Sequence, residues 1–231
     1  MRSTGLVGRW PLDSDTVVGT TARDVGRNGN DGTVLTDNCS LTTGIHDEAD
    51  GAIYSNGTCT GGEAKSNINS GATIVNTSNP WSVSLFVKND STTDDTFLVS
   101  LPKDNWGGWA HACLGIYLVS TTGKIIVFGR KSDDSGDVIT PQSTTSTNDG
   151  AWHHIVGQYT GTHLEVYVDG TREVNYDLAG QALRQGIGSF GICYLRGGGS
   201  VKFNGSIAKV LVYSYALTAG QIANLYQSYG V

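Results

Sequence analysis

The sequence predicts an all-β protein, a two-sheet antiparallel β-sandwich with one short C-terminal helix. Apolar and polar residues alternate with a period of two in many short segments along the chain, which is typical of strands. Clusters of Gly, Asn, Asp and Thr separate these segments and predict turns. Only 16% of the residues are charged and 32 are Gly, a composition that favours short strands joined by turns over helices.

The segment 81–88 shows the alternation most clearly, because its odd positions are all apolar, and it predicts a half-buried strand. Residues 163–168 repeat the pattern and lead into Asp169-Gly170, a dipeptide that tolerates the positive φ of a two-residue hairpin turn. We expect further strands over residues 96–101, 112–119, 124–130, 152–159, 189–195 and 207–213. Many short strands without helices between them predict a sandwich or barrel, here two packed sheets.

One segment near the C-terminus changes period. Four of its apolar residues fall near one helical face: Leu217, Ile222, Leu225 and Tyr226. Thr218 and Gln221 form a capping-box pattern at the start of this expected short helix. No Pro- or Ser-rich linker and no fixed repeat divides the chain, so we expect residues 1–231 to form a single domain.

Charge and hydropathy limit the expected partners. The formal net charge is −6 and no Lys- or Arg-rich block is present, so nucleic acid is not an expected partner. No apolar run approaches the roughly 20 residues of a membrane helix, so membrane insertion is not expected. Residues 1–5 lack the apolar stretch of a secretory signal peptide. We expect an extracellular or particle-surface location, reached after signal removal or by another route such as release in a virion.

The chain has four cysteines: Cys39, Cys59, Cys113 and Cys193. Cys39 and Cys59 flank a segment rich in Asn, Gly and Thr, where a disulfide would limit loop entropy, and we predict a bridge between them. The alternative of two thiols stays open, because disulfides persist in oxidising compartments and no signal peptide is visible.

Five segments occur in an order that is similar to one known family: 8–13, 22–33, 149–156, 164–170 and 203–218. The second contains the pattern D-x-G-x-N-G-x-D-G over residues 24–32. Together they resemble the laminin-G-like, concanavalin A-like lectin/glucanase superfamily over nearly the whole chain. The resemblance implies a jelly-roll sandwich. It does not imply one function, because the fold hosts lectins, adhesion modules, enzymes and virion parts.

The segment 24–31 is the candidate metal site. Its carboxylates, Asn oxygens and carbonyls suit Ca²⁺, which prefers six to eight oxygen ligands. The resemblance implies that Asp24 and a carbonyl near Asn28 ligate one structural calcium ion. Relatives often have an acidic residue where this chain has Ala208, so one expected carboxylate is missing. The alternative is a turn whose Asx and Gly residues hydrogen-bond among themselves.

The segment 103–109 is the candidate ligand-binding site. Trp106 and Trp109 offer flat apolar faces, and Asp104 and Asn105 offer hydrogen-bonding groups beside them. Sugars combine C–H patches with hydroxyls and match such a set. The alternative is that both rings close one end of the sandwich as packing residues.

Catalytic motifs are missing from the sequence. No G-x-S-x-G segment occurs, and none of the four Glu stands in the E-x-D-x-x-E spacing by which the glucanase branch places carboxylates on one strand face. His153 and His154 are expected on opposite faces of a strand, so they do not form one metal site or a dyad.

We therefore predict a non-catalytic, surface-displayed module that binds polysaccharide or glycan in adhesion. Its expected setting includes a virion decoration or fibre protein, in contact with other virion proteins or with copies of itself. The first alternative is a purely structural virion assembly protein, and the second is a polysaccharide-active glycoside hydrolase.

Overall fold

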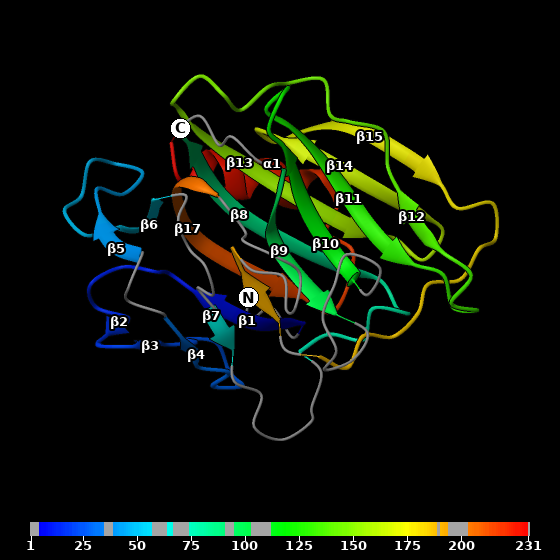
Figure 1. Ribbon diagram of the computed structural model, residues 1–231, viewed down its shortest axis with the longest axis horizontal. Coiled ribbons are helices and arrows are strands. Elements are labelled where there is room, and N and C mark those ends of the chain that lie inside the picture. Colours follow the sequence, from blue (N-terminus) through cyan, green and yellow to red (C-terminus); the bar gives the residue numbers. More distant parts are fainter. Residues whose placement is uncertain are drawn as a thin grey trace.

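The computed structural model describes residues 5–34, 39–56, 64–66, 74–90, 95–102, 112–188, 190–193 and 203–230. Their strands form two antiparallel sheets, which confirms the predicted sandwich (Figure 1). The eight-stranded sheet consists of β1 (Leu6–Trp10), β5 (Cys39–Thr42), β6 (Ala52–Asn56), β8 (Trp81–Asn89), β13 (Trp152–Tyr159), β14 (His163–Val168), β15 (Thr171–Asp177) and β17 (Asn204–Tyr213). The nine-stranded sheet consists of β2 (Val17–Val18), β3 (Thr21–Ala22), β4 (Gly32–Thr33), β7 (Ala64–Ser66), β9 (Thr96–Pro102), β10 (Ala112–Val119), β11 (Lys124–Arg130), β12 (Asp137–Ile139) and β16 (Gly191–Ile192).

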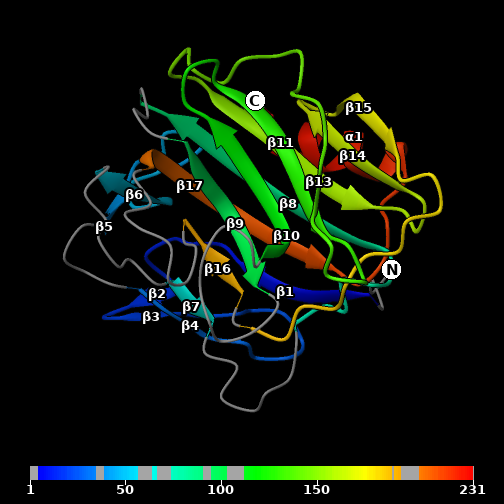
Figure 2. The same ribbon diagram turned by 45° about the vertical axis from the view of Figure 1, so that its right-hand side comes forward.

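The order of strands shows long-range pairing. The eight-stranded sheet runs β15-β14-β13-β8-β17-β6-β5, and β1 also pairs with β17. The nine-stranded sheet runs β12-β11-β10-β9-β16-β7-β4-β3-β2. The N-terminal strand β1 therefore lies beside the last strand of the chain (Figure 2).

The main core lies between the two sheets. Alternate residues of β8 and β10 meet there: Val83, Leu85, Val87, Leu114, Ile116 and Leu118. Gly157 of β13 allows close contact, because a Cβ at this position would lie 2.8 Å from the Ile116 side chain. Each large apolar side chain buried here stabilises the fold by about 1.5–3 kcal/mol.

Helix α1 (Ala219–Ser228) covers the outer face of the eight-stranded sheet, so the molecule has three layers (Figure 1). Ile222 of α1 packs with Val156 and Leu211 of that sheet. Thr218 is the N-cap, and its side chain and that of Gln221 make both hydrogen bonds of the predicted capping box. No helix in the described ranges is long and apolar enough to cross a membrane.

Several predicted elements are confirmed to the residue, namely β10, β11, β13 and β14. Asp169 and Gly170 have positive φ angles of 50° and 76°, which confirms the two-residue turn between β14 and β15. The half-buried character predicted for residues 81–88 is wrong. Ser82, Ser84 and Phe86 on the outer face of β8 are buried too, because α1 and the segment before it cover that face.

The strand predicted over residues 189–195 is shorter in the structure. Only Gly191 and Ile192 form β16, and Cys193 has a left-handed φ of 52° that ends the extended conformation. Residues 189, 194 and 195 lie outside the described ranges.

Candidate functional site

The predicted ligand-binding residues Asp104, Asn105, Trp106 and Trp109 lie outside the described residues. Their attachment points are described. Pro102, the last residue of β9, pairs with Ala112, the first residue of β10. Both ends of the connecting segment therefore lie side by side at one end of the nine-stranded sheet, which we call the loop end.

The backbone of residues 186–188 supports the loop end. The Gly188 amide donates to the Pro102 carbonyl oxygen over 3.1 Å, and the Gly186 amide donates to Thr77 Oγ1 over 2.8 Å. A Cβ at Gly186 would lie 2.9 Å from the Pro102 oxygen. This close approach fixes the position at which the chain leaves the sheet.

A charged cluster lies at the loop end, because the register places Gly129 opposite Leu114 and Arg130 opposite Asp137. The Arg130 guanidinium lies 2.7 Å from Asp134 Oδ1 and 2.8 Å from Asp137 Oδ1. Hydrogen bonding to Asp137, followed by that to Asp134, raises the pKa of Arg130, although its partial burial acts in the opposite direction. The sequence pattern did not predict this cluster. Its only signal was the Asp- and Ser-rich turn that follows a strand ending in Arg.

The outer face of the nine-stranded sheet carries an aromatic cluster, and Ala112 also packs in this cluster. Phe97, Tyr117 and Phe128 have ring centroids 5.0–5.7 Å apart. Phe97 lies over Gly115, where a Cβ would come within 2.4 Å of its ring. Burial, and to a smaller extent the Asp95 carboxylate, raises the pKa of Tyr117 far above its ordinary value. The cluster packs β9, β10 and β11 together, with Phe97 and Tyr117 toward the end of these strands opposite the loop end.

The candidate metal segment folds around Asp24, whose side chain is 6% exposed. Its Oδ1 accepts the amides of Arg9 and Gly26, each over 2.8 Å, and its Oδ2 accepts the Asn30 amide over 2.9 Å. The Asn28 side chain donates to the Val7 carbonyl oxygen over 3.1 Å. Three backbone N–H groups therefore donate hydrogen bonds to the Asp24 carboxylate. This is the arrangement expected of a turn that is held by its own hydrogen bonds.

A calcium ion at Asp24 would depend on oxygen ligands other than a cluster of described carboxylates. No group of three or more His, Cys, Asp or Glu residues that could hold a metal occurs within the described ranges. Ala208, the position where relatives often have an acid, is fully buried. Its neighbour Lys209 has a left-handed φ of 53° and places its ammonium 3.5 Å from Asp13 Oδ2 and 3.9 Å from Glu48 Oε1. Calcium at Asp24 stays a prediction.

The predicted disulfide is not described, because Cys59 lies outside the described residues. Cys39 lies in β5 and packs against the main core. The bridge and its alternative of two thiols both stay predictions.

The two adjacent histidines occupy different environments. His153 Nδ1 lies 2.8 Å from Asp169 Oδ2 and its Nε2 lies 3.0 Å from Asp149 Oδ1, and these hydrogen bonds raise its pKa despite burial. His154 lies under α1, where burial lowers its pKa to about 4. It stacks on Phe86 with ring centroids 4.7 Å apart. Both side chains serve packing and hydrogen bonding within the fold.

The described glutamates also have structural partners. Glu165 is buried and accepts hydrogen bonds from Gln158 Nε2 over 2.6 Å and from Arg172 Nη1 over 2.9 Å. Glu173 accepts the amides of Thr144 and Thr145. Glu63 lies outside the described residues. These contacts give Glu165 and Glu173 roles in holding the fold together.

A family model described as the concanavalin A-like lectin/glucanases superfamily matches residues 60–223, which is more than half of the chain. The chain belongs to this superfamily. Among curated protein sequences, none is significantly similar to this chain.

Solved structures show the same superfamily fold at low sequence identity. The binding domain of Paraclostridial Mosquitocidal Protein 1 is 15% identical with a TM-score of 0.65, and the match covers 97% of this chain and 52% of that one. Trypanosoma rangeli sialidase in complex with the inhibitor DANA is 17% identical with a TM-score of 0.68, and the match covers 98% of this chain and 34% of the enzyme. This chain therefore spans only part of those two proteins.

A third solved structure is similar to this chain over almost its entire length. It is domain 4 of AbnA, a GH43 extracellular arabinanase from Geobacillus stearothermophilus, in complex with arabinotriose. The two chains are 19% identical, and the match covers 96% of this chain and 98% of that domain with a TM-score of 0.58. At these identities the likeness concerns the fold.

Proposed function

We propose that this domain is a non-catalytic module that binds carbohydrate in adhesion, with the glycan held at the loop end of the nine-stranded sheet. In this proposal Trp106 and Trp109 stack on sugar rings, and Asp104 and Asn105 hydrogen-bond to hydroxyls. The likeness to the arabinotriose-bound domain supports it most, because that structure matches this chain in size as well as fold.

The loop end suits this role physically. Sugar binding needs aromatic faces and polar groups that hold fixed positions, since ordering them on binding costs free energy. The paired ends at Pro102 and Ala112 supply a rigid attachment, since the aromatic cluster packs the same strands together along their length. Arg130, held by Asp134 and Asp137, adds a charged group at the same end.

The double variant Trp106→Ala/Trp109→Ala tests the proposal. Binding to arabinotriose, arabinan, sialylated glycans and β-glucans is measured by calorimetry and affinity electrophoresis. We expect the wild type to bind at least one of them and the double variant to lose ten-fold or more, because stacking on two rings contributes about 1–3 kcal/mol.

Trp152→Ala is the matched control, since Trp152 is a half-buried tryptophan at the start of β13 in the other sheet. It should keep wild-type affinity. Absence of binding to the whole panel, or equal affinity of the double variant and the wild type, would refute the proposal. Sustained release of reducing sugar from any of the polysaccharides would refute its non-catalytic part.

The proposal includes display on an extracellular or particle surface, and a virion decoration or fibre protein is one such setting. Immunogold labelling of released particles tests it. Label on particles supports the virion setting, and label confined to the cell interior argues against surface display.

A further inference from the structure

A pocket of about 220 Å³ lies between the two sheets, far from the loop end. It is lined by Val17, Gly19, Val34, Cys39, Ser40, Leu41 and Ile53. The first three belong to the β2–β4 side of the nine-stranded sheet, and the others to β5 and β6 of the eight-stranded sheet. Four strands, β16, β7, β4 and β3, separate β9 from β2, so the pocket is distinct from the proposed glycan site.

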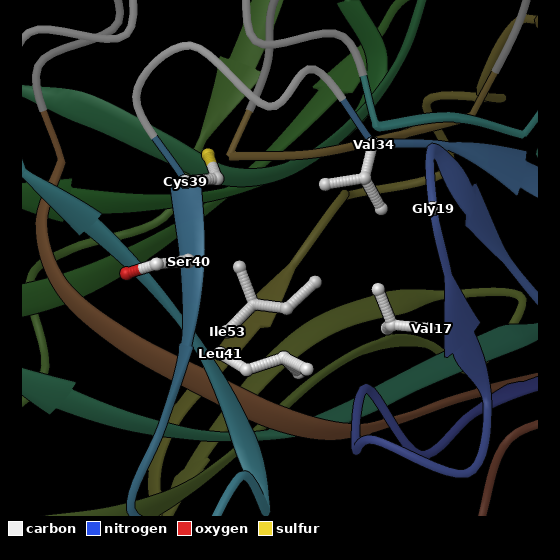
Figure 3. A pocket seen from close by; sticks show the side chains of 7 residues that line it. All are labelled: Val17, Gly19, Val34, Cys39, Ser40, Leu41 and Ile53. Atoms are coloured by element: carbon white, nitrogen blue, oxygen red, sulfur yellow. The ribbon is translucent and has the colours of Figure 1, made fainter.

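The walls of this pocket are mostly apolar and are formed by four aliphatic side chains together with Cys39. Figure 3 shows the side chains of Val17, Val34, Leu41 and Ile53 directed toward one another across the open space. The Ser40 hydroxyl points away from them, and Gly19 contributes no side chain (Figure 3). A hydroxyl-rich ligand would lose its hydrogen bonds to water here without finding replacements among these side chains.

Local structure keeps the space open. β2 is a two-residue edge strand, and Gly19 follows it with a φ of 60° in the turn toward β3. On the other side, Leu41 of the edge strand β5 pairs with Ile53 of β6. Aliphatic side chains from two sheet edges therefore face each other across this space, and Val17, Val34 and Ile53 also contact the main core.

We propose that this pocket binds a small apolar molecule, an aromatic ring or a short alkyl chain, through dispersion contacts with these four side chains. Apolar cavities of about 150 Å³ hold benzene. A pocket of about 220 Å³ accommodates a bicyclic ring such as indole. The apolar lining selects against free sugars, so this ligand class differs from that of the loop end.

Methyl NMR of the full chain with labelled Ile, Leu and Val residues tests the proposal, with indole and toluene as probes. We expect saturable shifts of the methyl signals of Val17, Val34, Leu41 and Ile53, and no such shifts with glucose or arabinotriose. Methyl groups of the main core, for example Leu85, should not move.

Adjacent positions of one strand provide the matched pair of variants. Val17 lines the pocket, whereas Val18 points outward and is 52% exposed. Val17→Phe should fill the pocket and abolish the indole-induced shifts, and Val18→Phe should leave them unchanged.

The proposal is overturned if indole and toluene cause no saturable shifts, or if Val17→Phe and Val18→Phe bind indole equally well. If Val17→Phe loses the native spectrum, Val34→Leu is tested instead, because it enlarges a pocket side chain by less. Val34→Leu should weaken indole binding, and Val18→Leu should not. Glycan binding by the Val17→Phe protein distinguishes failure here from failure of the proposed function.

Discussion

A single carboxylate organises the N-terminal turn of this domain. Asp24 joins Arg9 in β1 to Gly26 and Asn30 in the turn, and its own amide donates to Asp31 Oδ1 over 2.9 Å. Hydrogen bonds to a charged acceptor contribute about 1.5–3 kcal/mol each, and a buried N–H that loses its acceptor carries a cost of similar size. The turn is therefore sensitive to this one charge.

Asp24→Asn should lower the free energy of unfolding by about 2 kcal/mol, because the amide accepts fewer of these hydrogen bonds and lacks the charge. Urea unfolding measures the loss. The exposed Asp15→Asn is the control and should remain near the wild type. If the turn is self-bonded, the loss is the same in calcium and in chelator. A rise in melting temperature with calcium, in the wild type but not in Asp24→Asn, would instead establish Asp24 as a calcium ligand.

At the scale of elements, helix α1 attaches to the eight-stranded sheet through polar and aromatic contacts. The Leu217 amide lies 2.9 Å from Ser82 Oγ and 3.0 Å from Gln158 Oε1, which anchors the chain just before the helix. His154 lies between Phe86 of β8 and Tyr226 of α1. Its Nε2 is 2.8 Å from Ser84 Oγ, and its buried Nδ1 has no hydrogen-bond partner in the described part of the chain.

Acid should weaken this attachment. The pKa of His154 is lowered from 6.5 to about 4, so its contribution is complete above pH 6.5 and is lost as the pH falls toward 4. The loss amounts to about 3 kcal/mol at pH 4. His153 acts in the opposite sense, because its raised pKa gives stability at low pH that is lost as the pH rises through the folded value.

Urea unfolding of the wild type and His154→Phe between pH 7 and pH 4 separates these effects. The variant keeps a ring between Phe86 and Tyr226 but cannot be protonated, so it should lack the acid-dependent loss assigned to His154. Parallel curves for both proteins would contradict this assignment.

At the scale of the whole molecule, local sequence patterns predict where the strands lie better than they predict which residues cover those strands. β10, β11, β13 and β14 have six to eight residues each and are bounded by turn residues, and their bounds agree with the prediction to the residue. β2, β3 and β4 have two residues each, too few for a period to show. The two-sided burial of β8 depends on α1, more than a hundred residues away in sequence.

The candidate site also combines features that the sequence predicts with features that it does not predict. The sequence indicated the tryptophan-bearing segment and the turn at Asp24 by residue type. It did not indicate the apolar pocket, because the pocket forms where segments distant in sequence meet between the two sheets. The Arg130 cluster is local in sequence, since Asp134 and Asp137 follow Arg130 by 4 and 7 residues, but residue types alone do not show that these side chains meet. The pairing of Arg130 with Asp137 depends on the register of β11 with β12, which the pattern of residue types does not fix.

The burial of β8 on both faces has a consequence for the order in which the protein opens. β8 pairs with β13 on one side and β17 on the other, and both of its faces are covered. Its amides should exchange with deuterated water only on global unfolding, whereas those of the edge strand β15 should exchange through local fraying. Mass spectrometry of peptides from the two strands checks this, and equal exchange rates would contradict it. The strand that joins β13 to β17 would then be among the last to open.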